Sequence, residues 1–155
     1  MHRILLLALA FASSSLAAQP SFDSITTEVT DDIAAGYAEC AAFFLILKGA
    51  SDKSGKLTES AKFEAASGGA AEYSFTAAKR IRSENMASEV TLARVEMFLK
   101  DMYKTIDNNY SNMSLLVNRH LESCTEGLNN SAVFIKRRSD RINTEHGIAP
   151  NTPSK

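Results

Sequence analysis

Between Gly69 and Gly127 the chain contains neither glycine nor proline, and this long uninterrupted stretch is what most constrains the fold. Alanine, glutamate, lysine, leucine and methionine, which all favour helices, are plentiful in it. The strict alternation of apolar and polar residues that indicates β-strands is absent from the sequence. The sequence therefore predicts an all-α protein.

Apolar residues recur at steps of three or four in four segments, and each segment predicts one helix with a buried face. The predicted helices span about residues 24–48, 57–82, 88–107 and 111–126. Whether the second and third are one continuous helix stays open, because only Ser83–Asn85 separates them. Helices joined by short loops predict a single up-and-down four-helix bundle over residues 19–128.

The predicted buried faces consist mainly of the large apolar residues of each segment. On the first helix they are Ile25, Val29, Ile33, Tyr37, Cys40, Phe44 and Leu47. On the second they are Phe63, Ala66, Ala70, Tyr73, Ala77 and Ile81. On the third and fourth they are Leu92, Val95, Leu99, Met102 and Ile106, then Met113, Val117, Leu121, Cys124 and Leu128.

Gly68 and Gly69 lie inside the second predicted helix, where each glycine costs about 1 kcal/mol relative to alanine. We expect that a neighbouring helix approaches closely at this pair, with the bulky residues 43–47 of the first helix facing the small ones. A shallow ligand groove is the alternative.

Residues 1–18 have the pattern of a cleavable secretory signal peptide. The basic Arg3 precedes the apolar run Ile4–Ala12, which is far shorter than the roughly 20 residues of a membrane span. Small residues precede a cut after Ala17 or Ala18. We therefore expect export to a bacterial periplasm or to the cell exterior. An N-terminal membrane anchor or a buried first helix is the alternative.

Cys40 and Cys124, the two cysteines of the chain, each lie on a predicted buried face. In an exported protein such a pair favours a disulfide bond over two free thiols, and no Cys-x-x-Cys motif indicates a redox site. On the chain-entropy model, a bond across 84 positions stabilises the fold by about 4 kcal/mol. We expect this bond to close the bundle.

The near-neutral charge of the chain argues against a polyanionic partner that is attracted by a strong positive electrostatic potential. The chain carries 17 Lys and Arg against 18 Asp and Glu, and loss of Arg3 with the signal peptide brings the net charge to about −2. We therefore expect no nucleic-acid partner, and no transmembrane segment in the mature chain.

The sequence contains no recognisable catalytic set. Serine-hydrolase, phosphate-loop and dinucleotide signatures are absent, and no Glu-x-x-His pair lies on the predicted helices. We therefore expect no cofactor, no metal and no enzymatic activity. The most specific alternative is haem b held by His120 and one of the methionines Met86, Met97, Met102 and Met113.

Two features suggest contact with another protein. Phe43, Phe44 and Leu47 belong to a segment that is apolar on every side, so it either lies at the centre of the bundle or meets a partner. Lys136, Arg137 and Arg138 form a basic run in residues 129–155, which we expect to be a disordered tail after a short helical extension.

The expected function is that of an exported, non-enzymatic helical protein that binds another protein or has a structural role in the cell envelope or exterior. A haem-carrying periplasmic bundle is the first alternative. A small exported enzyme of unknown chemistry is the second.

Overall fold

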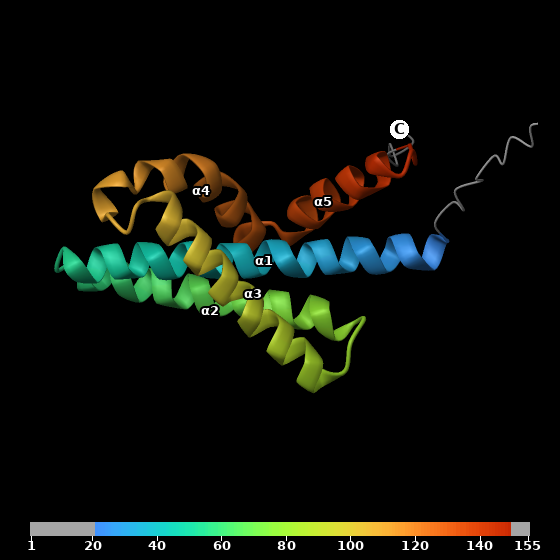
Figure 1. Cartoon of the computed structure of the whole chain (residues 1–155), viewed down its shortest axis with the longest axis horizontal. Coiled ribbons are helices and arrows are strands. Elements are labelled where there is room, and N and C mark those ends of the chain that lie inside the picture. Colours follow the sequence, from blue (N-terminus) through green and yellow to red (C-terminus); the bar gives the residue numbers. More distant parts are fainter. Residues whose placement is uncertain (1–20, 150–155) are drawn as a thin grey trace, which may run out of the picture.

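The computed structural model describes residues 21–149, which form five α-helices, one short 3-10 helix and no strand (Figure 1). The helices are α1 (Phe22–Lys53), α2 (Leu57–Lys79), α3 (Glu84–Thr105), η1 (Tyr110–Asn112), α4 (Ser114–Asn129) and α5 (Ser131–Glu145). The all-α prediction is confirmed. The predicted signal peptide, residues 1–18, lies outside the described residues, and so do residues 150–155.

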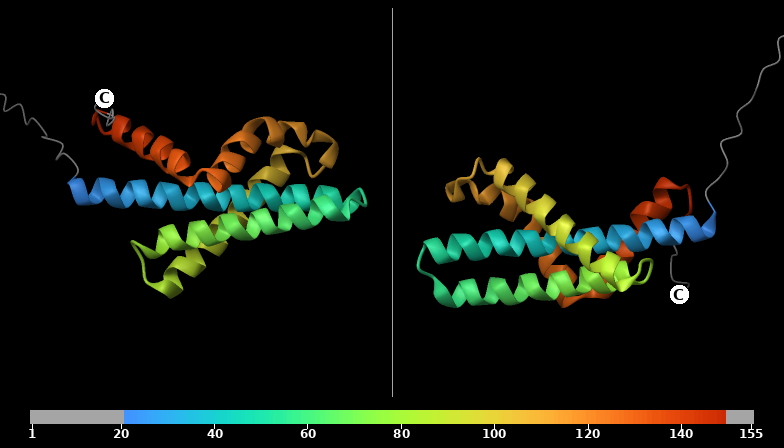
Figure 2. Two further views of the ribbon diagram at one scale, coloured as in Figure 1. Left: turned by 180° about the vertical axis from the view of Figure 1, so that it is seen from behind. Right: turned by 60° about the horizontal axis from the view of Figure 1, so that its bottom comes forward.

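Helix α1 is the central element of the molecule. Helix α2 runs back along it, and α3 crosses both on the same side, whereas α4 and α5 lie on the other side of α1 (Figure 1; Figure 2). The Ser21 side chain caps α1, because its Oγ accepts a hydrogen bond from the backbone N–H of Ser24 at 3.3 Å. Helices α2, α3, α4 and α5 each pack against α1.

The predicted disulfide between Cys40 and Cys124 is present and joins α1 to α4, with the two Cα atoms 5.2 Å apart. Around it lies the main core, in which the side chains of Phe43, Ile46 and Leu116 are fully buried. The predicted buried face of α1 is largely confirmed. By length and composition α1 could also cross a membrane, but 61% of that apolar stretch is buried in the fold.

Helix α2 contacts α1 through small residues. The hydroxyl of Ser67 donates to the carbonyl oxygen of Ala41 at 2.9 Å, and that of Ser74 donates to the carbonyl oxygen of Ala34 at 2.8 Å. Ala70 lies between these two serines along the helix and is fully buried. The two backbones can therefore approach closely, with the buried hydroxyl groups hydrogen-bonded.

The glycine pair of α2 does not make this close contact. A Cβ atom on Gly68 would meet nothing within 4 Å, and one on Gly69 would meet only the Leu128 side chain at 3.8 Å. The prediction that a helix approaches closely at this pair is therefore wrong. The serines and alanines on the adjacent face of α2 provide the contact instead.

The predicted buried faces of α3 and α4 are only partly correct. Leu92 is 62% exposed, and the neighbouring Thr91 is buried in its place. Leu121 is 41% exposed, whereas the buried residues of α4 are Leu116, His120, Cys124 and Gly127. The buried face of α4 thus differs from the predicted one by about one position along most of the helix, and both include Cys124.

The expected helical extension is present as α5, which reaches Glu145 and so occupies much of the region expected to be a disordered tail. Its residues Phe134 and Ile142 are buried, and the Phe134 ring lies 4.5 Å from that of Tyr37, between centroids. Burial of these apolar side chains holds the segment as a helix. Because α5 is a fifth helix, the predicted four-helix up-and-down bundle is not confirmed. Helices α2 and α3 are separate, with a break over residues 80–83.

Candidate functional site

A cluster of charged side chains connects α1, α4 and α5. Arg138 of α5 lies between two carboxylates of α1: its Nη1 is 3.1 Å from Oδ2 of Asp32, and its Nη2 is 3.5 Å from Oε2 of Glu39. Arg141 also donates to Asp32. On the far side of Glu39, Nδ1 of His120 lies 3.4 Å from Oε1. Ion pairs therefore join α5 to α1, and the contact between Glu39 and the His120 ring joins α4 to the same cluster.

The local sequence explains how Arg138 fits this position. Asp32 and Glu39 are seven residues apart and so share one face of α1. Gly36 lies between them on the same helix, and a Cβ atom there would overlap the Arg138 guanidinium. The guanidinium carbon also lies 5.0 Å from the centroid of the Phe134 ring, which favours the cation. Glycine at position 36 thus gives the guanidinium room to lie directly against the helix backbone.

His120 is a packed core residue. Its side chain is nearly buried, and its ring lies 5.6 Å from that of Phe43. Burial lowers the pKa of His120 below its ordinary value; the nearby Arg119 lowers this pKa further, and the Glu39 carboxylate opposes the shift. The imidazole is therefore held mainly neutral.

The surroundings of His120 do not fit haem. The adjacent cavity of about 190 Å³ is smaller than the roughly 300 Å³ at which pockets for drug-sized ligands begin, and haem is a large ligand. Met102 lines this cavity, but Met86 and Met97 are about half exposed on α3. Within residues 21–149, no three His, Cys, Asp or Glu side chains are grouped as they would be around a metal ion.

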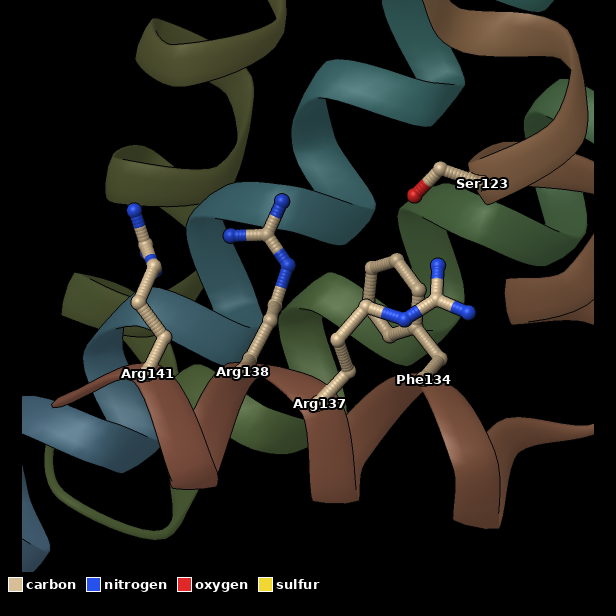
Figure 3. Close-up of a pocket in the computed structure, with 5 residues that line it drawn as sticks. All are labelled: Ser123, Phe134, Arg137, Arg138 and Arg141. Carbon is tan, nitrogen blue, oxygen red and sulfur yellow. The ribbon is translucent and has the colours of Figure 1, made fainter. Parts of the chain in front are cut away.

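A second cavity, of about 250 Å³, lies beside the charged cluster between α4 and α5. We call it the arginine pocket, and it is lined by Ser123, Phe134, Arg137, Arg138 and Arg141 (Figure 3). The arginine side chains extend from α5, and those of Arg138 and Arg141 point toward α1, whereas Arg137 lies beside Phe134 and near Ser123 (Figure 3). The pocket therefore combines three cations with one aromatic ring.

The arginines of this pocket are fixed yet still accessible. The side chains of Arg137 and Arg141 are 58% and 54% exposed, although each has a carboxylate partner, Glu126 at 2.8 Å and Asp32 respectively. A guanidinium has five N–H donors, so these contacts leave donors for a further acceptor. The pocket can therefore bind an anionic group without losing the contacts that orient its arginines.

The structure separates the two groups of residues predicted to bind a partner. Phe43, Phe44 and Leu47 have exposures of only 0%, 5% and 8%, so they form the core, and their assignment to a partner surface is corrected. The apolar surroundings of a central helix explain why this segment is apolar on every side. Of the basic run, Arg137 and Arg138 line the arginine pocket, whereas Lys136 does not and pairs with Asp140.

Sequence reasoning grouped Arg141 with the basic run Lys136–Arg138, but it did not include Ser123 or Phe134 in the site. Residues 134, 137, 138 and 141 follow the helical spacing of three, one and three, which brings them to one face of the expected helical extension. The spacing was therefore a usable signal for three of the arginines and the phenylalanine. Nothing in the sequence indicated Ser123, because it lies on another helix.

Comparisons with models of protein families, with curated proteins and with solved structures found no match to this chain.

Proposed function

We propose that this protein is exported and acts by binding rather than by catalysis, with an acidic segment of another protein as the group that it recognises in the arginine pocket. The observation that carries the proposal is the set of three arginines on one face of α5, of which two are more than half exposed. Arginine binds carboxylates through paired hydrogen bonds, which gives both affinity and orientation.

Two observations support export. Residues 1–18 have the basic start, short apolar run and small residues of a secretory signal. The Cys40–Cys124 bond belongs to the kind of crosslink that persists in oxidising compartments. Cell fractionation followed by N-terminal sequencing tests this part, and we expect the mature chain to begin at Ala18 or Gln19.

A protein partner fits the charge better than nucleic acid does. The net charge of the whole chain is −1, so no overall field draws a polyanion to the surface. Three arginine side chains are instead gathered in a small pocket beside the apolar Phe134 ring. A short acidic segment that also carries an apolar side chain matches this combination.

Site-specific crosslinking in the producing cells tests the proposal. A photo-reactive amino acid at position 136, which is exposed beside the pocket, is expected to capture a defined partner. The same group at position 62, an exposed position on α2 that does not line the pocket, is the control and is expected not to capture it. Arg137→Glu and Arg141→Glu should each abolish the crosslink.

Lys100→Glu on α3 is the matched charge reversal, because it changes the net charge equally at an exposed site far along the chain from the pocket. The crosslink should survive this substitution and weaken with rising salt. Equal loss with Lys100→Glu, or equal capture from position 62, would contradict the proposal. Circular dichroism of each variant checks that the helices remain folded.

A further inference from the structure

A third cavity, of about 250 Å³, lies between α1, α2 and the start of α5, on a different face of α5 from the arginine pocket. We call it the tyrosine pocket. Its lining is mainly aromatic and aliphatic, with one cationic side chain: Thr30, Ile33, Tyr37, Tyr73, Thr76, Ala77, Arg80, Ser131 and Ile135. None of these residues takes part in the proposed protein-binding site.

The apolar part of the tyrosine pocket is preformed. The Tyr37 and Tyr73 rings lie 5.1 Å apart, and the Tyr37 hydroxyl donates to the carbonyl oxygen of Gly127 at 3.3 Å, which fixes that ring. Tyr73 and Ile135 remain 43% and 39% exposed. Large apolar side chains left partly open around a cavity are typical of sites where an apolar group binds.

The charged part of the pocket is Arg80, at the C-terminal end of α2. Within residues 21–149 Arg80 has no ion-pair partner, because the nearby Glu84 pairs with Lys79 at 2.7 Å. An exposed guanidinium without a carboxylate, beside an apolar cavity, is complementary to an acid with an apolar body. The first residue of α5, Ser131, also lines the pocket. The partial positive charge at the N-terminal end of that helix favours an anion in the pocket, as Arg80 does.

From this arrangement we propose that the tyrosine pocket binds a small free carboxylic acid with an aromatic or branched apolar body. The carboxylate contacts Arg80, and the apolar body packs against Tyr37, Tyr73 and Ile135. The volume of about 250 Å³ lies below the range of pockets for drug-sized ligands, so it suits a smaller molecule.

Titration of the isotopically labelled protein with 3-phenylpropionate, followed by nuclear magnetic resonance, tests this proposal. We expect saturable shifts confined to residues around the tyrosine pocket, with a dissociation constant of about 0.1 to 1 mM for a ligand of this size. The neutral 3-phenylpropanol tests the need for the carboxylate, and acetate tests the need for the apolar body. Both should bind at least about tenfold more weakly.

Two variants localise the site. Arg80→Gln should weaken binding about tenfold, because it removes a charge-assisted contact, while Lys62→Gln removes an equal charge from an exposed position of α2 that does not line the pocket and should leave binding unchanged. Thr76→Trp, at an exposed position of the lining, should fill the cavity and abolish the shifts. Both substitutions of the lining affect exposed side chains, so the fold should persist, and thermal unfolding verifies it.

Three results would overturn the proposal. The first is equal binding of the acid and the alcohol, and the second is an equal effect of Arg80→Gln and Lys62→Gln. The third is the appearance of the shifts at the arginine pocket instead. A short peptide that ends in phenylalanine is included as a separate arm. If this peptide bound and the free acid did not, the occupant would be a protein C-terminus and the proposal would be wrong.

Discussion

At the scale of single residues, Gly36 and Arg138 depend on each other. Alanine in place of a helical glycine normally stabilises a protein by about 0.5–1 kcal/mol. At position 36 the added methyl group would displace the guanidinium that contacts Asp32 and Glu39. We therefore expect Gly36→Ala to lower the free energy of unfolding by about 1–2 kcal/mol, since hydrogen bonds to charged groups are worth about 1.5–3 kcal/mol. Urea denaturation measures this change.

Gly68→Ala is the matched control, because nothing lies within 4 Å of the methyl group it adds. This substitution should raise the free energy of unfolding by about 0.5–1 kcal/mol. In an Arg138→Met background the penalty of Gly36→Ala should shrink, since the guanidinium that it displaces is gone. An equal penalty in both backgrounds would show that the two residues are not coupled.

His120 makes the stability depend on pH. Because burial holds its pKa in the folded protein below the ordinary value of 6.5, the unfolded chain binds the proton first as the pH falls. Stability from the neutral ring is therefore complete above about pH 6.5 and is lost as the pH falls from there through the folded-state pKa. We expect the free energy of unfolding to decrease from pH 7 to pH 5.

His120→Gln should flatten this decrease, and urea denaturation at several pH values measures it. Glu39→Gln provides a second arm, because the Glu39 carboxylate raises the pKa of His120. Without that carboxylate the pKa of His120 falls further, so the loss of stability should extend to a lower pH. Identical pH profiles of the wild type and His120→Gln would rule out a role of this ring. The charged groups around the ring are Glu39 on α1 and Arg119 on α4, and Asp101 of α3 lines the adjoining cavity.

At the scale of helices, the burial of Phe134 decides whether α5 is a folded element. The basic residues of α5 are trypsin sites, so their resistance to cleavage reports on the docked helix. We expect slow cleavage there in the native protein and rapid cleavage in Phe134→Ala, which should cost about 3 kcal/mol. Ile135→Ala, at a more exposed neighbouring position, should leave the resistance nearly unchanged. Equal cleavage of both variants would contradict the docking of α5.

The same helices show how far periodicity in the sequence reaches. On α1 the large apolar residues are buried because other helices cover this helix on several sides. On α2 the buried positions include Ser60, Ser67 and Ser74, which a search for large apolar residues passes over. On α4 the polar His120 is buried against Phe43 and Glu39 of α1, whereas the apolar Leu121 is exposed. Such contacts depend on a partner helix, and a single helical pattern does not contain them.

The candidate site was predictable to a similar extent. Arg137 and Arg138 stand out in the sequence as a basic run, but the run alone does not show which side chains share a face. Their pocket exists because Phe134 anchors α5 and because Gly36 admits Arg138 to the surface of α1. Both causes act between residues about 100 positions apart, beyond the range of any local pattern.

At the scale of the whole molecule, the Cys40–Cys124 bond joins α4 to α1, two helices that otherwise contact each other much less than α1 and α2 do. Helices α1 and α2 pack along most of their lengths, whereas α4 contacts α1 over a much shorter stretch. Because the bond spans 84 positions, its removal should lower the free energy of unfolding by about 4 kcal/mol on the chain-entropy model. Titration of the unfolded, unreduced protein should find no free thiol.

Reduction should therefore loosen the molecule unevenly. After treatment with a reductant, we expect amide hydrogen exchange to rise first in α4 and α5, while the α1–α2 pair stays protected by its buried serines and alanines. The double variant Cys40→Ala/Cys124→Ala should show the same pattern without reductant, which separates loss of the bond from side effects of the reagent. If exchange rose equally in all five helices, the fold would be one cooperative unit, and the bond would act on the unfolded chain alone.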